Sequence, residues 1–255
     1  MPIGCPFDSH GFLGFPGSAL AVGFRILMEH ASKSPRLPLG ENLKCTRSLA
    51  PLGILLLFAA VALAAPASFH GTQRSVPEAL AVRMREHSWR QGCPTPIADL
   101  VYVRLSHYGY DGAVHEGELV IHKELAPEVL AIFRALFDRR FPVEKMKVID
   151  DYQGDDDASM ADNNTSAFNC RFVAGKPGVF SMHSRGRAVD VNPRTNPMVV
   201  DSAILPPAGA AFLDRKSNAP GILRAGDPTV REFTRRGWSW GGDWTSMKDY
   251  QHFEK

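Results

Sequence analysis

The stretch FSMHSRGRAVDVNP, residues 180–193, places His183 and Asp190 seven residues apart around Gly186. Seven residues rise about 10.5 Å in a straight α-helix and more than about 20 Å in a straight strand. Zinc needs each ligand atom within about 2.0–2.2 Å. If both residues bind one ion, the chain must reverse between them, and Gly186 tolerates the positive φ that such a turn requires. The alternation of residues 187–192 then predicts a returning strand with Asp190 on one face.

The C-terminal sequence DYQHF, residues 249–253, adds further candidate ligands. Asp249 and His252 are three residues apart, which places them on one face if this segment is a helical turn. His183, Asp190 and His252 would make a three-ligand zinc set. Asp249 would either close the site as a fourth ligand of a structural zinc or act on a water held in an open fourth position. Spacing alone leaves both open, together with the alternative of a surface histidine and a strand-end aspartate.

Two motifs resemble the zinc D-Ala-D-Ala peptidase family. SMHSRGRAVDVN resembles its S-x-H-x-x-G-x-A-x-D motif, and WGGDWTSMKDYQHFE resembles the C-terminal motif of its carboxypeptidase and endolysin-like branch. DDASMADNNTSAFNCR is also similar to a segment that precedes the metal motif in exported members. The resemblance runs from about residue 100 to the C-terminus. It implies a hedgehog/DD-peptidase-like zinc peptidase fold, which is α+β with a small antiparallel sheet flanked by helices.

The resemblance also implies residue roles. His183, Asp190 and His252 match the zinc ligands, with one Zn²⁺ per chain, and Asp249 matches the catalytic acid/base. Ser181 matches a serine beside the first ligand, which suggests a hydrogen bond behind the metal. Family members use an arginine to hold the oxyanion or a substrate carboxylate. Arg171 is the candidate here, and Arg185 and Arg187 are the alternatives.

The pattern of the remaining chain predicts an α+β fold, because strands and helices mix without regular alternation. Residues 77–91 have helical spacing with Pro at the first position. Residues 100–108 and 117–122 form an antiparallel hairpin, and residues 127–141 form an amphipathic helix packed on a sheet. We also expect a short strand at residues 145–150, an acidic loop after it, a loop over residues 192–228 and a short helix over residues 228–237.

The N-terminal third has a different character. Residues 1–48 suggest a disordered extension or a mis-annotated start, with Met28 as a plausible initiator. Residues 49–67 are uncharged and apolar, follow a basic flank and end in small residues, as in a secretory signal, although a retained membrane anchor is the alternative. Residues 68–76 read as a linker before a zinc peptidase domain at residues 77–255. We therefore expect an exported protein, periplasmic or extracellular, that meets the membrane only through the apolar segment if it is not cleaved.

The cysteines and the remaining aromatic and acidic residues admit simpler readings. Cys93 and Cys170 fall after the predicted signal, so an exported chain would pair them in a disulfide, whereas the alternative is two buried thiols. Asp243 lies between glycine and tryptophan in a predicted tight turn. Three C-terminal tryptophans are expected to line a substrate groove or to pack in the core: Trp238, Trp240 and Trp244. Three histidines of the hairpin are expected to be structural or to lie at the surface: His107, His115 and His122.

The composition argues against nucleic acid as a partner. The 255-residue chain has a formal net charge of +2, and no basic run is interleaved with aromatic residues, so nucleic acid is not expected as a partner. We expect an exported monomer. The resemblance implies a zinc metallopeptidase that acts on peptidoglycan stem peptides next to D-residues, as a D,D-carboxypeptidase or an L-Ala-D-Glu endopeptidase. The alternative is a cell-wall binding module with a structural zinc and no catalysis.

Overall fold

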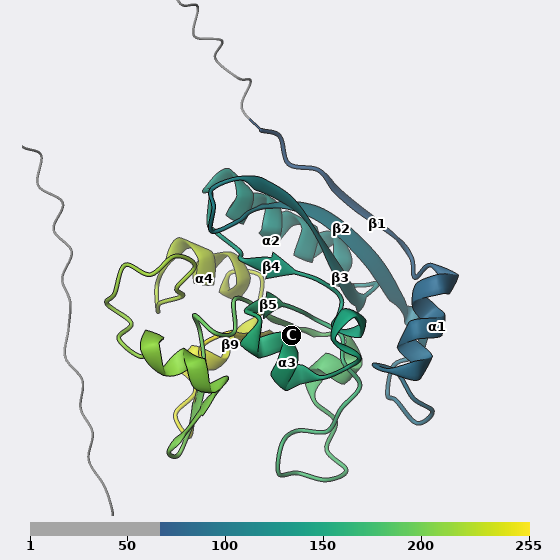
Figure 1. Ribbon diagram of the computed structural model, residues 1–255. Coiled ribbons are helices and arrows are strands. Elements are labelled where there is room, and N and C mark those ends of the chain that lie inside the picture. Colours follow the sequence, from purple (N-terminus) through teal and green to yellow (C-terminus); the bar gives the residue numbers. More distant parts are fainter. Residues whose placement is uncertain (1–66) are drawn as a thin grey trace, which may run out of the picture. The chain divides into compact units, whose positions relative to one another are not determined.

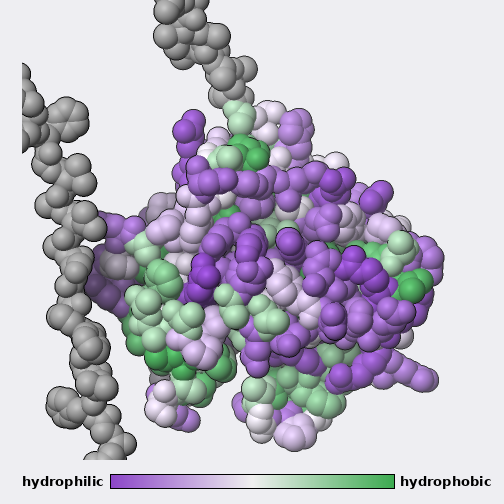
Figure 2. All heavy atoms as spheres, in the orientation of Figure 1, coloured by the Kyte–Doolittle hydropathy of each residue, from purple (hydrophilic) through white to green (hydrophobic). Residues whose placement is uncertain are grey.

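The computed structural model describes residues 67–255, which form an α+β arrangement of small sheets and short helices (Figure 1). The predicted extension over residues 1–48 and all but the last residue of the apolar segment lie outside these described residues. Within residues 67–255, no helix is long and apolar enough to cross a membrane. The mixture of helices and small sheets confirms the α+β fold class. The face seen in Figure 2 is largely hydrophilic with smaller hydrophobic areas.

The central hairpin is formed by β2 (Leu100–Tyr108) and β3 (Val114–His122), which pair antiparallel over nine residues each. Helix α2 (Ala126–Asp138) packs its apolar face on this sheet, as expected from the sequence. Alternate residues of the strands, such as Val103 and Leu119, join α2 in the larger core, because successive strand side chains point to opposite faces. The other face is buried as well, against helix α1 (Glu78–Glu86), through residues such as Tyr102.

The segment predicted as a linker contains a strand instead. Gly71–Ser75 forms β1, which pairs antiparallel with β2 from Gly71 opposite Leu105 to Ser75 opposite Val101. All five residues of β1 are exposed. Backbone N–H and C=O groups make this pairing, so it needs no apolar side chains. The polar sequence GTQRS therefore shows no apolar alternation by which the strand could have been predicted.

Short strands build the C-terminal half. One sheet has the order β6 (Ala188–Asp190), β11 (His252–Glu254) and β9 (Ser239–Trp240), and another has the order β10 (Lys248–Asp249), β7 (Met198–Val200) and β8 (Ala203–Leu205). Both are antiparallel. Strands β4 (Lys145–Met146) and β5 (Asn164–Thr165) form a parallel pair. Helix α4 (Pro228–Thr234) agrees with the predicted short helix.

Two segments predicted as loops contain regular structure. Residues 192–228 include β7, β8 and the 3₁₀ helix η4 (Pro207–Phe212). The acidic segment includes η2 (Ile149–Tyr152) and helix α3 (Asp156–Ala161). The Asp155 side chain accepts a hydrogen bond from Ala158 N and so caps α3. Acidic residues stabilise a helix at its first turn, so the composition that suggested a loop here also starts a helix.

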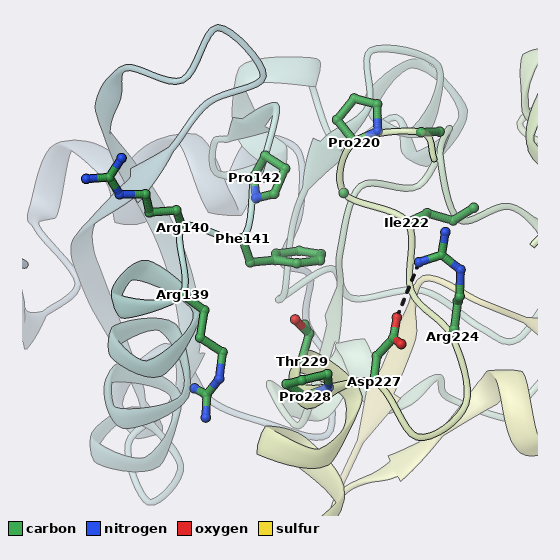
Figure 3. A pocket seen from close by; sticks show the side chains of 12 residues that line it. Arg139, Arg140, Phe141, Pro142, Pro220, Ile222, Arg224, Asp227, Pro228 and Thr229 are labelled. Atoms are coloured by element: carbon green, nitrogen blue, oxygen red, sulfur yellow. Dashed lines mark ion pairs between the residues drawn. The ribbon is translucent and has the colours of Figure 1, made fainter. Parts of the chain in front are cut away.

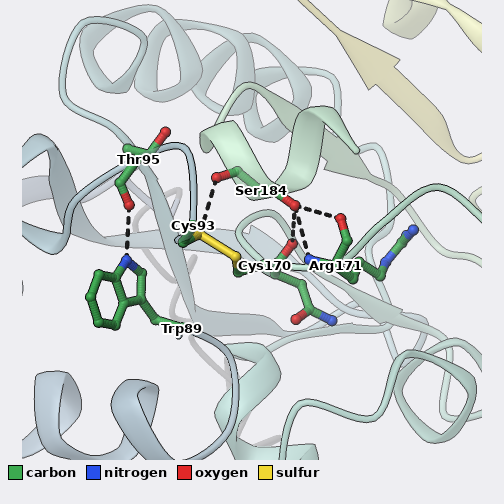
Figure 4. Close-up of a disulfide and its surroundings, with 7 residues drawn as sticks. Trp89, Cys93, Thr95, Cys170, Arg171 and Ser184 are labelled. Atoms are coloured by element: carbon green, nitrogen blue, oxygen red, sulfur yellow. Dashed lines mark hydrogen bonds between the residues drawn. A yellow bond between two sulfur atoms is a disulfide. The ribbon is translucent and has the colours of Figure 1, made fainter. Parts of the chain in front are cut away.

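Cys93 and Cys170 are joined in a disulfide that connects the segment after α1 to the segment before the His183 turn (Figure 4). Around it, Arg171 N donates a hydrogen bond to Ser184 Oγ at 2.9 Å, and Asn169 N donates to His183 O at 3.3 Å. The cross-link therefore anchors the strand-like segment against which the candidate ligand turn is held.

Breaking this disulfide is expected to destabilise the domain. It spans 77 residues, and closing a loop of that size restricts the unfolded chain by about 4 kcal/mol in the chain-entropy model. The Cys93→Ser/Cys170→Ser double variant should lose about 2–5 kcal/mol of unfolding free energy in urea titrations. Reductant should lower the stability of the wild type and leave the double variant unchanged. Equal stability of the two proteins without reductant would contradict this assignment.

Candidate metal centre

His183, Asp190 and His252 converge in the folded chain although they are far apart in sequence. Each offers one donor atom, and the three atoms lie within 4.8 Å of one another. His183 comes from the 3₁₀ helix η3 (Met182–Arg185), and Asp190 ends β6. Strand β11 pairs with β6 in a register that sets His252 directly opposite Asp190. The antiparallel pairing of these two strands therefore brings the second histidine to the first two residues.

The reversal expected at Gly186 is present. Gly186 ends η3 with a φ of +64°, and its carbonyl accepts a hydrogen bond from His122 N at 2.8 Å. A Cβ at this position would lie 2.7 Å from His122 N. Gly186 is therefore required both by its left-handed backbone and by the close approach of β3.

Gly186→Ala is expected to cost about 3 kcal/mol of unfolding free energy or more, since a left-handed alanine costs about 1–2 kcal/mol and the clash with β3 adds about 1–3 kcal/mol. Gly112→Ala is the matched control, because Gly112 has a φ of +73° and a Cβ added there would meet no atom within 4 Å. It should show the left-handed cost alone. Urea unfolding of both variants tests this, and equal losses would remove the steric part of the argument.

The donor set fits a zinc ion. His183 Nε2 lies 3.2 Å from His252 Nδ1 and 3.1 Å from Asp190 Oδ2, and His252 Nδ1 lies 2.9 Å from Asp190 Oδ1. Tetrahedral zinc with ligand bonds of about 2.0–2.1 Å separates its ligand atoms by about 3.3 Å. The two nitrogens and the two oxygens of the Asp190 carboxylate thus lie at nearly the mutual spacing of zinc ligands. Two imidazole nitrogens and one carboxylate oxygen are also a donor combination that zinc accepts.

Each histidine is oriented by a hydrogen bond from the ring nitrogen that faces away from the cluster. His183 Nδ1 donates to the carbonyl oxygen of Ala167, which leaves Nε2 with its lone pair toward the cluster. His252 Nε2 lies 3.0 Å from Glu254 Oε2, so Nε2 carries its proton toward Glu254 and Nδ1 faces Asp190. Glu254 lies two residues after His252 on β11, and strand alternation puts both side chains on one face. Glu254 was not among the sequence candidates, although this two-residue spacing after a ligand histidine was a signal for it.

Glu254→Gln is expected to weaken zinc binding about 10–100-fold, because a carboxylate behind a ligand histidine fixes its orientation and raises its basicity. Competition with a chromogenic chelator measures this affinity without any assay of activity. Glu116→Gln is a suitable control, since Glu116 is an exposed carboxylate of β3 outside the cluster. Unchanged zinc affinity in Glu254→Gln would show that this hydrogen bond has no part in metal binding.

The cluster contains ionisable groups although it is buried. His183, Asp190 and His252 are only 2%, 7% and 6% exposed. Burial opposes ionisation of Asp190, but the two histidines outweigh it and hold the pKa of Asp190 far below its usual value. Burial would likewise lower the pKa of His252, yet its hydrogen bonds to Asp190 and Glu254 raise that pKa to about 10. Without metal, a proton on His252 therefore supplies the positive charge that Asp190 needs, and a cation bound between the same atoms would replace it.

Asp249 lies beside the cluster but not on a helical turn, so that prediction was wrong. Asp249 ends β10, a two-residue turn follows, and His252 begins β11. Strands β10 and β11 belong to different sheets, and the turn joins them. The side chain is 9% exposed, and its Oδ1 has no hydrogen-bond partner. Burial raises the pKa of Asp249 to about 6, while the nearby His252 opposes the shift.

Gly241 explains how Asp249 fits there. Gly241 belongs to the 3₁₀ turn η5 (Gly241–Asp243), and a Cβ on it would lie 2.8 Å from the Cβ of Asp249. Only a glycine leaves room for the Asp249 side chain at this place. Asp243 is exposed at the end of the turn, in keeping with the tight turn predicted around it. It does not belong to the metal-ligand cluster.

Ser181 and Arg171 hold the His183 turn. The Ser181 hydroxyl accepts a hydrogen bond from His183 N at 3.3 Å and caps η3. The backbone of Arg171 bonds to both Ser181 N and Ser184 Oγ. The Arg171 guanidinium, however, pairs with Asp156 of α3. The alternatives are placed elsewhere: Arg187 bonds to Glu124 and to the Lys255 carbonyl, and Arg185 is exposed.

The tryptophans divide between core and site. Trp238 and Trp240 are each 3% exposed and belong to the main hydrophobic core. Trp244 is partly exposed, and its ring centroid lies 5.4 Å from that of His252. Of the hairpin histidines, His107 is buried and bonds to the Val143 carbonyl, and His115 pairs with Asp111 at the surface. Of the three tryptophans, only Trp244 stands next to the metal centre.

A family model described as D-alanyl-D-alanine carboxypeptidase matches residues 174–255. Residues 174–255, about a third of the chain, are thus similar to the D-alanyl-D-alanine carboxypeptidase family. The match contains the convergent ligand set and Asp249, and it begins just after Arg171. The resemblance inferred from the two motifs is thereby confirmed, and the chain is a hydrolase of the D-alanyl-D-alanine carboxypeptidase-like zinc metallopeptidase type. Comparison with curated proteins and with solved structures gave no match.

Proposed function

We propose that this protein is an exported zinc metallopeptidase that hydrolyses peptide bonds next to D-residues in peptidoglycan stem peptides, as a D,D-carboxypeptidase or an L-Ala-D-Glu endopeptidase. The observation that carries the proposal is the buried carboxylate of Asp249 beside a His–Asp–His set at zinc-ligand spacing, within a carboxypeptidase family match. Export rests on the apolar segment over residues 49–67 and on a substrate class found outside the cytoplasm. We further propose one zinc per chain and a monomeric enzyme.

His183, Asp190 and His252 would hold the zinc. When bound, zinc polarises a carbonyl oxygen and lowers the pKa of a bound water toward about 7. Asp249 is the proton carrier of this site. With a pKa near neutrality it can accept a proton from the attacking water and return it to the leaving amine. Its unpartnered Oδ1 leaves one carboxylate oxygen free for that transfer.

Arg171 is proposed to act on the substrate rather than on the metal. Its backbone is fixed to the His183 turn, but its guanidinium must leave Asp156 to reach a substrate carboxylate or a developing oxyanion. The Asp156 pairing is partly exposed, and an exposed ion pair contributes little free energy. Exchange of one carboxylate partner for another therefore costs little.

Digestion of defined muropeptides by the zinc-loaded protein tests the proposal. Mass spectrometry of the products distinguishes release of a terminal D-alanine from cleavage between L-alanine and D-glutamate. Protein treated with a chelator is the control and should release neither fragment. If the zinc-loaded protein cleaves none of these substrates, the proposed activity is wrong.

A further inference from the structure

A cavity of about 410 Å³ lies along β10, next to Asp249 in the chain. Lys248 and Tyr250, which flank Asp249, both line it, and so does Gly242 of the η5 turn. Gly241, the neighbour of Gly242, packs directly against Asp249. The cavity thus shares β10 and η5 with Asp249, whereas the ligands His183, Asp190 and His252 come from η3, β6 and β11.

The cavity carries more positive than negative charge: four basic side chains line it, and among residues 67–255 only Arg224 pairs with a carboxylate, that of Asp227. Arg215, Lys216 and Lys248 line it, and among residues 67–255 none of the three forms an ion pair with a carboxylate. Lys248 Nζ donates to the carbonyls of Gly242 and Trp244 at 3.1 and 2.6 Å. These neutral partners fix the ammonium group but leave its charge uncompensated.

Arg215 shows the same imbalance. Its two terminal nitrogens donate to three backbone carbonyls and to Asn196 Oδ1, whereas its Nε is buried without a partner. The guanidinium also lies over the Tyr250 ring, 4.5 Å from its centroid. Burial lowers the pKa of Arg215 to about 10, so the charge is held at a cost that a nearby anion would offset.

A second cavity of about 400 Å³ gives the contrast (Figure 3). It is also lined by arginines, of which Arg139 and Arg224 pair with carboxylates, and Arg224 lines both cavities. Arg139 pairs with Glu232 at 2.9 Å and Arg224 with Asp227 at 3.6 Å. Arg140 lies over the Tyr108 ring. Among the described residues, three basic side chains of the cavity along β10 thus lie outside any ion pair, against one, Arg140, in the second cavity.

We propose that the cavity of Arg215, Lys216 and Lys248 is a subsite for a free carboxylate of an acidic peptide substrate held at the metal centre. This inference rests on the proposed function. It adds a feature of the substrate, a free carboxylate, that the metal ligands do not recognise. Tyr250 and the edge of Trp240 supply an apolar wall beside the cations. A charged cavity of this kind selects an acidic peptide over its neutral analogue, because a charge-assisted hydrogen bond is lost when the carboxylate becomes an amide.

The test compares two synthetic stem peptides that differ only in the free carboxyl of D-glutamate, which is a carboxylate in one and an amide in the other. Their affinities are measured by calorimetry with the zinc-loaded Asp249→Asn variant, so that binding is read without cleavage. The carboxylate peptide should bind about tenfold more tightly or better. Equal affinities, or no measurable binding of either peptide, would overturn the inference.

Lys216→Glu identifies the cavity as the source of this preference, since Lys216 is exposed and its side chain makes no ion pair within residues 67–255. In the otherwise wild-type enzyme it should raise KM for the carboxylate peptide about tenfold and leave kcat and the amide peptide unchanged. Lys147→Glu makes the same charge change at an exposed lysine outside the cavity and should alter neither constant. If Lys216→Glu affects both peptides equally, the inference is wrong although the enzyme is active. If the wild type cleaves nothing, the proposed function fails while the binding measurement still decides the subsite.

Discussion

Replacing Asp249 by asparagine is expected to lower kcat by about two to four orders of magnitude while one zinc stays bound. General acid–base catalysis by a positioned carboxylate contributes about that factor, and asparagine keeps the shape but cannot carry the proton. Steady-state hydrolysis of a muropeptide, together with metal analysis of the same sample, measures both quantities. Asp243→Asn is the matched control, because Asp243 is exposed on the neighbouring turn and should change neither.

The same variant should be at least as stable as the wild type in the metal-free form. Burial raises the pKa of Asp249 from 3.8 to about 6, so the folded protein binds this proton more tightly than the unfolded chain. Ionisation then costs folding free energy that grows between about pH 4 and pH 6 and persists above, on the order of 3 kcal/mol. Asparagine removes that cost. Urea unfolding at pH 7.5 should therefore show an inactive protein that is not destabilised, which separates a catalytic defect from misfolding.

Loss of zinc from Asp249→Asn would lead to the opposite conclusion. Asp249 would then be a fourth ligand, the site would be closed, and the zinc would be structural. A cell-wall binding module with a structural zinc would be the better interpretation. Retained zinc, unchanged wall binding and no activity to lose in the wild type would favour that module as well. The two measurements on one variant thus distinguish the enzyme from the module.

The sequence predicted the metal centre better than it predicted the sheets around it. The Gly186 reversal could be foreseen because His183 and Asp190 cannot share an ion on any straight element, and glycine adopts a left-handed φ at the least cost. The hairpin and α2 were also predictable, since long alternating or amphipathic segments carry a strong signal. In contrast, β7, β8 and β10 have two or three residues each. Segments so short have no period to recognise, and their pairing depends on distant partners.

The turn between Asp249 and His252 shows the limit most clearly. A three-residue spacing suits a helical face, and nothing local excluded it. The register of β11 against β6 decides the matter, because it fixes His252 opposite Asp190 and so forces a strand at that position. Glu254 then falls on the same face as His252 and becomes its partner. The missed residue and the wrong element thus have one cause, a strand pairing between segments 62 residues apart.

His183→Ala is expected to abolish stoichiometric zinc binding. The wild type should carry about one zinc per chain, while the variant keeps only two of the three donors and loses the nitrogen whose direction the Ala167 carbonyl fixes. His115→Ala is the control: it removes a histidine that is paired with Asp111 at the surface, and it should leave the zinc content unchanged. Circular dichroism verifies that both variants fold, and metal analysis after gel filtration gives the stoichiometry. A full zinc complement in His183→Ala would place the metal elsewhere and would remove the basis of the proposed activity.

The pH dependence of zinc binding tests the same cluster without a mutation. In the metal-free protein the pKa of His252 is about 10, so its Nδ1 holds a proton at neutral pH that zinc must displace. Zinc affinity should therefore fall as the pH is lowered from 8 to 6, by up to about tenfold per pH unit, since one proton is released for each ion bound. Proton release on zinc addition, measured in weakly buffered solution, checks this directly. Zinc binding with no proton released at pH 7 would contradict a protonated His252 in the metal-free cluster.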